Sequence, residues 1–210
     1  MACLALPNIA YCVADGKIVF LDVRGDRYFA LACDVPEIQP GENASAILRD
    51  RMPAALKAED PLLCDGLPHP REDIDHSDAP WSALVHAGRI LLLAAFYRRC
   101  LKRLGLDATF HRFQSRTIRL IAAGRHPLAG DAERIAGSVR TMKQLLTLRD
   151  QCLPLALGLG EYLHRRGLRP TVALGVMARP FRAHSWVQLD QRVMSDRLEA
   201  IHPYTPIIVL

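Results

Sequence analysis

The segment CLPLALGLGEYLHRRG occupies residues 152–167 and decides how the second half of this chain folds. The apolar residues after Pro154 are spaced to form the buried stripe of a helix, which we predict over about 152–166. Cys152 therefore lies at or beside the N-terminus of that helix, where free backbone N–H groups favour an anion and lower the pKa of a thiol. The same N–H groups can face the oxyanion that forms when a thiolate attacks a carbonyl.

Two glycines, Gly158 and Gly160, lie inside the predicted helix. Each should cost about 1 kcal/mol relative to alanine, so we expect another element to approach this face closely. The strand predicted over 183–190 is the candidate. Alternation along that strand places His184 and Trp186 on the same face.

A thiolate nucleophile needs an imidazole partner, and the imidazole needs an acceptor that fixes its tautomer. His184 can meet the first need. Asp196, just after a returning strand at 192–195, is predicted to lie close to the position opposite His184, whereas Asp190 sits at the turn and points away. Taken alone, each of these residues has an ordinary structural explanation. Cysteine is commonly buried, a histidine on a strand is commonly a satisfied or exposed side chain, and an aspartate after a strand is commonly a turn residue. Their order along the chain nevertheless favours a catalytic triad.

The first 67 residues predict a three-stranded β-meander followed by two short helices. The strands span 9–14, 17–23 and 26–32, and the helices span about 43–51 and 53–59. Turns at Asp15-Gly16 and Arg24-Gly25 join the strands, because glycine supplies the positive φ that a tight turn requires. This pattern is typical of a small winged-helix-like domain, which we do not expect to be an enzyme by itself.

Residues 68–80 are rich in proline and acidic residues, and we predict an exposed linker there. A second domain over 81–210 follows. Its predicted helices span about 81–104, 107–121, 131–148 and 152–166, and its predicted strands span 169–178, 183–190 and 192–195. Residues 203–210 are predicted to form an edge strand, because their two prolines are poorly tolerated in a central one. The fold class is therefore α+β.

Charge also divides the chain. Residues 1–80 hold seven Lys/Arg and fourteen Asp/Glu, a net charge of −7, while residues 81–210 hold twenty and eight, a net charge of +12. This asymmetry favours two units with different surfaces. The basic residues are scattered over predicted helices and aromatic residues make up only 6% of the chain, which disfavours a nucleic-acid surface.

Six cysteines occur, at positions 3, 12, 33, 64, 100 and 152, and they form no CxxC pair. Nothing before them looks like a secretory signal, so we expect free thiols and a cytoplasmic location. The longest apolar run, 90–97, is too short to span a bilayer. We expect no metal site and no membrane partner.

Three segments of the second domain resemble a known family. They are CLPLALGLGEYLHRRG at 152–167, PFRAHSWVQLDQRVMSD at 180–196 and PYTPI at 203–207. Together they resemble the lasso-peptide biosynthesis B proteins, over most of the second domain. The resemblance implies a transglutaminase-like or papain-like cysteine peptidase fold with Cys152, His184 and Asp196 as its catalytic triad. The family usually has a basic or small residue where this chain has Leu155, so no substrate contact is carried over to that position.

Residues 1–66 resemble the leader-recognition domain that many of these proteins carry, most clearly in KIVFLDVRGDRYFAL at 17–31. In such domains the leader adds as a strand beside the third strand and packs on the last helix. The groove residues that this resemblance implies are Tyr28, Phe29 and Leu56. Trp186, near His184 on the same strand, is a further candidate for substrate contact.

The resemblance implies a function: binding the leader of a ribosomally made lasso-peptide precursor and hydrolysing the bond between leader and core. It also implies an ATP-dependent macrolactam synthetase as a partner that receives the freed core. The chain contains no GxxxxGK[ST] loop, so we expect no cofactor of its own and assign any need for ATP to that partner. Two alternatives stay open, namely acyl transfer to an amine and a non-catalytic leader-binding adaptor whose Cys152 is merely buried.

Overall fold

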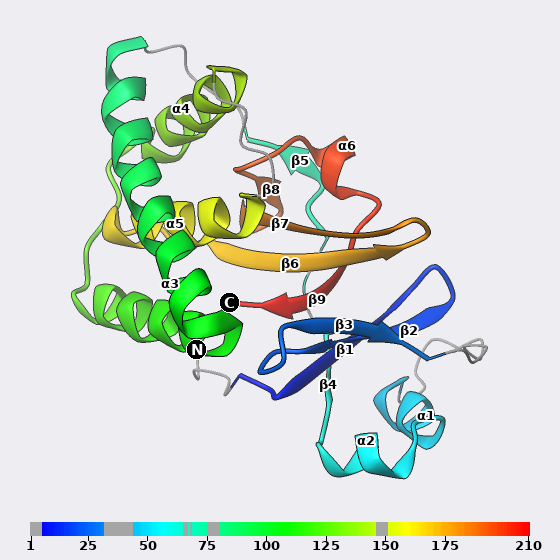
Figure 1. Cartoon of the computed structure of the whole chain (residues 1–210). Helices are drawn as coiled ribbons and strands as arrows, with labels where there is room; N and C mark the ends of the chain where they lie inside the picture. The colour runs from blue at the N-terminus through cyan, green and yellow to red at the C-terminus, as the bar shows by residue number, and fades with distance from the viewer. Residues whose placement is uncertain (1–5, 32–43, 65–66, 68, 75–79, 146–150) are drawn as a thin grey trace.

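The structure is a computed structural model that describes residues 6–31, 44–64, 67, 69–74, 80–145 and 151–210 (Figure 1). Its first elements are β1 (Ile9–Ala14), β2 (Lys17–Asp22), β3 (Arg27–Ala30), α1 (Ala44–Asp50), α2 (Ala54–Ala58) and β4 (Leu62–Leu63). The others are β5 (Glu72–Asp73), α3 (Pro80–Ala122), α4 (Asp131–Leu145), α5 (Cys152–Arg165), β6 (Thr171–Ala178), β7 (Phe181–Leu189), β8 (Arg192–Val193), α6 (Leu198–Ile201) and β9 (Thr205–Val209). The predicted α+β class is confirmed.

The N-terminal sheet has the strand order β3-β2-β1-β4. The predicted meander is confirmed, because β2 pairs antiparallel with both β1 and β3, and the short β4 adds in parallel to β1. Gly16 has a φ of 73° in the first turn, as predicted, but in the second turn the positive φ of 49° belongs to Asp26. Gly25 is needed there for a different reason, since the Asp22 carboxylate folds over it and accepts its N–H at 2.7 Å. The likeness to a winged helix stays a prediction.

The two faces of this sheet pack into different cores. One face places Ile9, Tyr11, Ile18 and Phe20 against Leu48 and Met52. The other face places Ala10, Cys12, Val19 and Leu21 in a larger core that also contains residues of α3, α5, β6 and β9. Alternation along a strand sends neighbouring side chains to opposite faces. The N-terminal sheet is therefore packed directly against the rest of the chain.

The C-terminal sheet has the strand order β5-β8-β7-β6-β9. The long β6–β7 hairpin pairs Thr171 with Gln188 at one end and Ala178 with Phe181 at the other. β9 lies at the edge and pairs antiparallel with β6, as its prolines predicted. The helices α3, α4 and α5 gather on one side of this sheet, and the N-terminal sheet lies below β9 (Figure 1). Among the described residues, no helix is both long and apolar enough to cross a membrane.

The glycines of α5 allow the close approach of neighbours other than the one predicted. A Cβ on Gly158 would lie 2.7 Å from the backbone nitrogen of Ala94 in α3, and a Cβ on Gly160 would lie 2.5 Å from Val172 Cγ2 in β6. The prediction that β7 requires these glycines was therefore wrong. Helix α3 can run along α5 because its chain bends at Gly105, with φ 80° and ψ −178°, where a helix stop was predicted.

The stretch predicted as an exposed linker is partly built into the fold. Glu72 and Asp73 form β5, which pairs in parallel with β8, and Ile74 is 4% exposed within the larger core. Arg71, Glu72 and Asp73 are exposed, in keeping with the prediction, whereas Ile74 is buried through long-range packing that no local pattern shows. Residues 75–79 of the predicted linker lie outside the described residues.

Candidate active site

Cys152 is the first residue of α5, as the sequence predicted. The preceding Gln151 has φ −119° and ψ 16° and offers no side-chain hydrogen bond to the first turn. The first N–H groups of a helix have no intrahelical partner, and here they belong to Cys152 and Leu153. These N–H groups can therefore stabilise a negative charge on the sulfur, or an oxyanion that forms beside it.

Two residues of β7 contact the Cys152 sulfur. The imidazole of His184 hydrogen-bonds to it, and the Ser185 hydroxyl lies 4.0 Å away, at the outer limit for a hydrogen bond to sulfur. Burial by itself raises the pKa of Cys152, but the hydrogen bond and positive charge of His184 outweigh it, so the pKa lies below its ordinary value. This arrangement favours a thiolate beside an imidazolium.

His184 links the sulfur to a carboxylate. Its Nε2 lies 3.5 Å from Asp196 Oδ2, an ion-pair contact at the long end of the hydrogen-bond range. Its ring lies against that of Tyr204, with 5.4 Å between the centroids. Burial lowers the pKa of His184, but Asp196 and Cys152 both stabilise the cation and raise the pKa to about 9. With Nε2 directed at the carboxylate, Nδ1 is the ring nitrogen left for the sulfur.

Asp196 is held from several sides. Lys143 Nζ donates to Oδ1 at 2.6 Å, and Ser195 Oγ donates to Oδ2 at 2.7 Å. Ser195 Oγ also accepts the backbone N–H of Val187 at 2.9 Å, which ties this loop to β7. Burial raises the pKa of Asp196, but His184 and Lys143 outweigh burial and lower the pKa to about 2. The carboxylate is therefore ionised at neutral pH.

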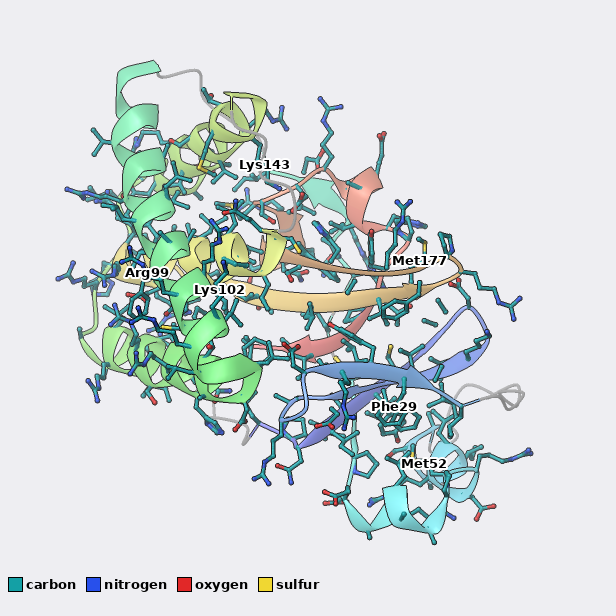
Figure 2. The ribbon with its side chains drawn as sticks, viewed as in Figure 1. Phe29, Met52, Arg99, Lys102, Lys143 and Met177 are labelled. Carbon is teal, nitrogen blue, oxygen red and sulfur yellow. The ribbon has the colours of Figure 1, made fainter. Side chains whose placement is uncertain are left out.

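Lys143 was not predicted as part of this site. It lies in the last turn of α4, 53 residues before Asp196 in the sequence, and it extends toward the C-terminal sheet in Figure 2. A lysine at that place already has an ordinary explanation, because a cation favours the C-terminal end of a helix dipole. Only the fold, which brings the last turn of α4 to the loop after β8, reveals its contact with Asp196.

Asp190, the other candidate acceptor, has φ 52° in the turn after β7 and is exposed. Its backbone carbonyl accepts a hydrogen bond from Gln188 Nε2 at 2.9 Å, within the turn itself. The His184 ring contacts Asp196 instead. This agrees with the expectation that Asp190 points away.

Trp186 is buried in a small core of the C-terminal sheet. It is only 1% exposed, packs with Ala173, Val193 and Ile201, and donates its Nε1–H to Gln188 Oε1 at 3.0 Å. Its ring fills the space over Gly175, where an added Cβ would lie 2.7 Å from the indole. Alternation does place Trp186 on the His184 face of β7, as predicted, but α6 covers that part of the face. The burial of Trp186 leaves almost none of this side chain exposed for contact with a substrate.

The three residues predicted to form one leader groove divide between two faces of the N-terminal sheet. Phe29 is 39% exposed and stacks on Phe20 with 5.0 Å between ring centroids. Leu56 of α2 packs against the same small core, and Figure 2 shows Phe29 and Met52 on that side of β3. Tyr28 points the other way and packs on the larger core. Phe29 and Leu56 can therefore belong to one surface, whereas Tyr28 belongs to another.

The surroundings of Asp196 include a recess of about 290 Å³, bordered by α4, β5, β8 and α6. Its charged lining residues are Asp73, Arg140, Lys143, Asp196 and Arg197. No cluster of three or more His, Cys, Asp or Glu that could hold a metal ion occurs within the described part of the chain. The four cysteines described there, 12, 64, 100 and 152, are all free thiols.

A comparison with known proteins supports one assignment. The family model described as the transglutaminase-like superfamily matches residues 91–209, a range that contains Cys152, His184 and Asp196. The N-terminal sheet lies outside this match. No curated protein and no solved structure gives a significant match to the chain.

Proposed function

This chain belongs to the transglutaminase-like superfamily, which includes cysteine peptidases and acyltransferases, and from that premise we propose that it is a cysteine leader peptidase. Its substrate is the precursor of a ribosomally made lasso peptide, and its product is the core peptide with a free N-terminus. The site acts in the cytoplasm without a cofactor of its own. An ATP-dependent macrolactam synthetase is the partner that takes up the freed core.

The observation that carries this proposal is the run of contacts from Cys152 through His184 to Asp196 at the start of α5. A lowered thiol pKa, a raised imidazole pKa and an ionised carboxylate are what nucleophilic catalysis by cysteine requires. A cysteine kept only for packing would have no imidazolium beside it. Cys12 is such a case, because burial raises its pKa to about 12.

The reaction follows from these three groups. The Cys152 thiolate attacks the scissile carbonyl carbon, and the first N–H groups of α5 stabilise the oxyanion. Collapse of this intermediate breaks the C–N bond while the His184 imidazolium protonates the departing amine of the core. A water molecule, deprotonated by His184, then hydrolyses the leader thioester and regenerates the thiolate. Asp196 keeps the imidazole oriented through both halves of the cycle.

Leader binding is assigned to the edge of the N-terminal sheet. β3 is an edge strand, and its outer backbone groups can pair with an extended peptide. Phe29 and Leu56 offer apolar contacts on one face of that edge. Capture of the leader raises the local concentration of its scissile bond to about the millimolar range for a short linker. A peptidase site with little sequence preference of its own would therefore act selectively on the precursor whose leader is bound.

The test is cleavage of a lasso precursor by the purified protein in water labelled with ¹⁸O. Hydrolysis puts one labelled oxygen on the new leader carboxylate. Transfer to an added amine without label would instead establish an acyltransferase, and binding without cleavage would establish an adaptor. Cys152→Ala should abolish cleavage and leave leader binding intact, with Cys64→Ala, at another cysteine outside any disulfide, as the matched control.

A second matched pair tests the third member of the site. Asp196→Ala should lower kcat/KM by about 10²-fold to 10⁴-fold, because the imidazole loses the acceptor that orients it. Asp190→Ala changes an exposed turn residue and should leave kcat/KM within about twofold. Equal losses in the two variants would remove Asp196 from its assigned role.

A further inference from the structure

Neighbouring residues of β3 serve different surfaces. Phe29 stacks on Phe20 toward α1, whereas Tyr28 lies on the face that packs against the larger core. The Tyr28 ring contacts Phe181, the first residue of β7, with 5.3 Å between centroids and 57° between planes. An edge strand of the N-terminal sheet thus places an aromatic ring on the catalytic half of the molecule.

The face of β7 that receives Tyr28 also carries Ser185, which contacts the nucleophile. Phe181 and Ser185 are four residues apart, so alternation puts both on one face. Ser185 contacts the Cys152 sulfur. At about 3.3 Å per residue, Phe181 lies about 13 Å along the strand from that contact, which is the length of about four extended substrate residues. Burial raises the pKa of Tyr28, and the charges of Asp26, Cys152 and Cys12 add to this increase.

The position of Tyr28 relative to Cys152 is fixed by the fold. Asp15, in the turn between β1 and β2, accepts hydrogen bonds from the backbone N–H groups of Ala178 and Arg179 at 2.8 and 3.1 Å. Those two residues lead into the turn before Phe181. Together with the shared core, this contact holds β3 at a set distance from the start of α5.

The aromatic pair is accessible. Phe181 is 51% exposed, and Tyr28 is only partly buried. Large exposed aromatic side chains beside a reactive group commonly mark a binding surface. A peptide that pairs with the edge of β3 and reaches Cys152 has to cross the short distance between them, where these two rings lie.

We propose that Tyr28 and Phe181 form a subsite that holds an apolar or aromatic side chain of the leader, within about four residues before the scissile bond. This inference rests on the proposed peptidase function. It moves Tyr28 from the leader-docking surface of Phe29 and Leu56 to the cleavage site. The subsite selects the bond to be cut, and the docking surface selects the precursor.

The closing experiment compares adjacent residues of one strand. Tyr28→Ala and Phe181→Ala should lower kcat/KM for the precursor by about 10-fold to 100-fold, the cost of losing one buried apolar contact. Neither should weaken binding of a leader peptide that lacks its last five or so residues, because those residues meet the subsite. Phe29→Ala should weaken binding of that shortened leader. Leu128→Ala, another exposed apolar residue, serves as the control for truncation alone.

The subsite also predicts which substitution in the substrate lowers kcat/KM. Replacing the apolar leader residue by alanine should cost the wild type about as much as Tyr28→Ala does, and should cost the Tyr28→Ala protein little more. Additive losses, or loss of shortened-leader binding in Tyr28→Ala, would overturn the inference. Tyr28→Phe keeps the ring, so it should retain selectivity and exclude a folding defect as the cause.

A reagent test separates this inference from the proposed function. Because the proposed subsite lies on the path to the thiol, Tyr28→Ala should increase the rate of Cys152 modification by a bulky maleimide relative to iodoacetamide, whether or not the protein cleaves any peptide. An unchanged ratio of the two rates would overturn the subsite. A changed ratio in a protein that cleaves no precursor would reject the peptidase and support the subsite geometry.

Discussion

Two cysteines of this chain show what decides the reactivity of a half-buried or buried thiol. Cys12 is 1% exposed, and burial, with a smaller effect from Cys64, raises its pKa to about 12. Cys152 is also desolvated, yet its pKa is lowered, because an imidazolium and a helix N-terminus lie against it. Both thiols are shielded from water, so their pKa values differ because Cys152 has an imidazolium beside it and Cys12 does not.

This contrast predicts the pH dependence of alkylation. Cys152 should react with iodoacetamide with a midpoint below the ordinary thiol value of about 8.5. In His184→Ala the thiol loses the strongest of the interactions that oppose the effect of burial, so the midpoint should move to higher pH. Mass spectrometry of tryptic peptides over a range of pH measures this, with unmodified Cys12 as the internal control. An identical midpoint in wild type and His184→Ala would contradict the ion pair.

Asp196 forms ion pairs with two side chains, Lys143 and His184. In Lys143→Met the pKa of Asp196 rises from about 2 but stays well below neutrality, so the carboxylate remains charged and acts on His184 alone. The pKa of His184 should then rise above about 9, and the alkaline limb of kcat/KM should move to higher pH. A pH–rate profile measures this shift. Lys143→Arg should leave the limb in place, and a lower rate without any shift would mean a merely structural role.

The sequence could predict the residues of the site that carry a chemical signature and not those that only support them. Cys152 and His184 could be found because a thiol at a helix start and an imidazole on the next hairpin form a recognisable order. Lys143 could not be assigned, since a lysine on a helix end has a common structural role. Tyr28 was assigned to the leader groove, but its contact with Phe181 was not expected. Both contacts depend on which elements pack together, and no local pattern encodes that.

At the scale of elements, α5 is fixed to α3 by a buried charge. Glu161 is 0% exposed and accepts hydrogen bonds from Arg116 at 2.6 and 2.8 Å, from Tyr97 at 2.6 Å, and from Arg165 at 2.6 and 2.9 Å. Burial raises the pKa of Glu161, but these donors outweigh burial and lower it. The network holds the helix whose first residue is the nucleophile.

Glu161→Gln should destabilise the protein by about 3–5 kcal/mol, because it removes the negative charge that Arg116 and Arg165 face and replaces one of the two acceptor oxygens by an NH2 donor. The folded-state pKa of Glu161 is lowered, so its contribution is present above the ordinary pKa and is lost as pH falls through the lowered value. Denaturant unfolding at neutral and acidic pH measures both effects, and the difference between wild type and variant should shrink in acid. Glu59→Gln, at an exposed site, should change neither curve. A constant difference at both pH values would contradict the charged network.

The elements themselves were largely predictable, and the contacts between them were not. Periodicity identified β1, β2 and α5 to within a residue or two, because each follows its own local spacing. The two-residue strands β4 and β5 lack any period, so nothing in the sequence could reveal them. The glycines of α5 correctly predicted that another element packs closely against the helix. They could not show which element it is, because a glycine has no side chain whose chemistry indicates a partner.

At the scale of the whole molecule, two sheets share one apolar core. Residues of β1 and β2, such as Ala10 and Leu21, pack with residues of α5 and β9, such as Leu157 and Ile207. The N-terminal sheet therefore contributes to the stability of the catalytic half. A leader captured at β3 is held by a surface that cannot move far from Cys152 without opening this core.

Adjacent residues of β2 test this coupling. Leu21 and Phe20 are both 0% exposed, but Leu21 lies in the shared core and Phe20 in the small core beneath α1. Leu21→Ala should destabilise the protein by about 2–5 kcal/mol and lower the unfolding midpoint reported by Trp186, which lies in the C-terminal sheet. The fluorescence of Trp186 is measured in a Trp81→Phe background, in which Trp186 is the single tryptophan. Phe20→Ala should lower that midpoint less, since the residues around it can loosen locally. A Trp186 midpoint unmoved by Leu21→Ala would mean that the two sheets unfold independently, and that the distance from leader strand to thiol is not set by a common core.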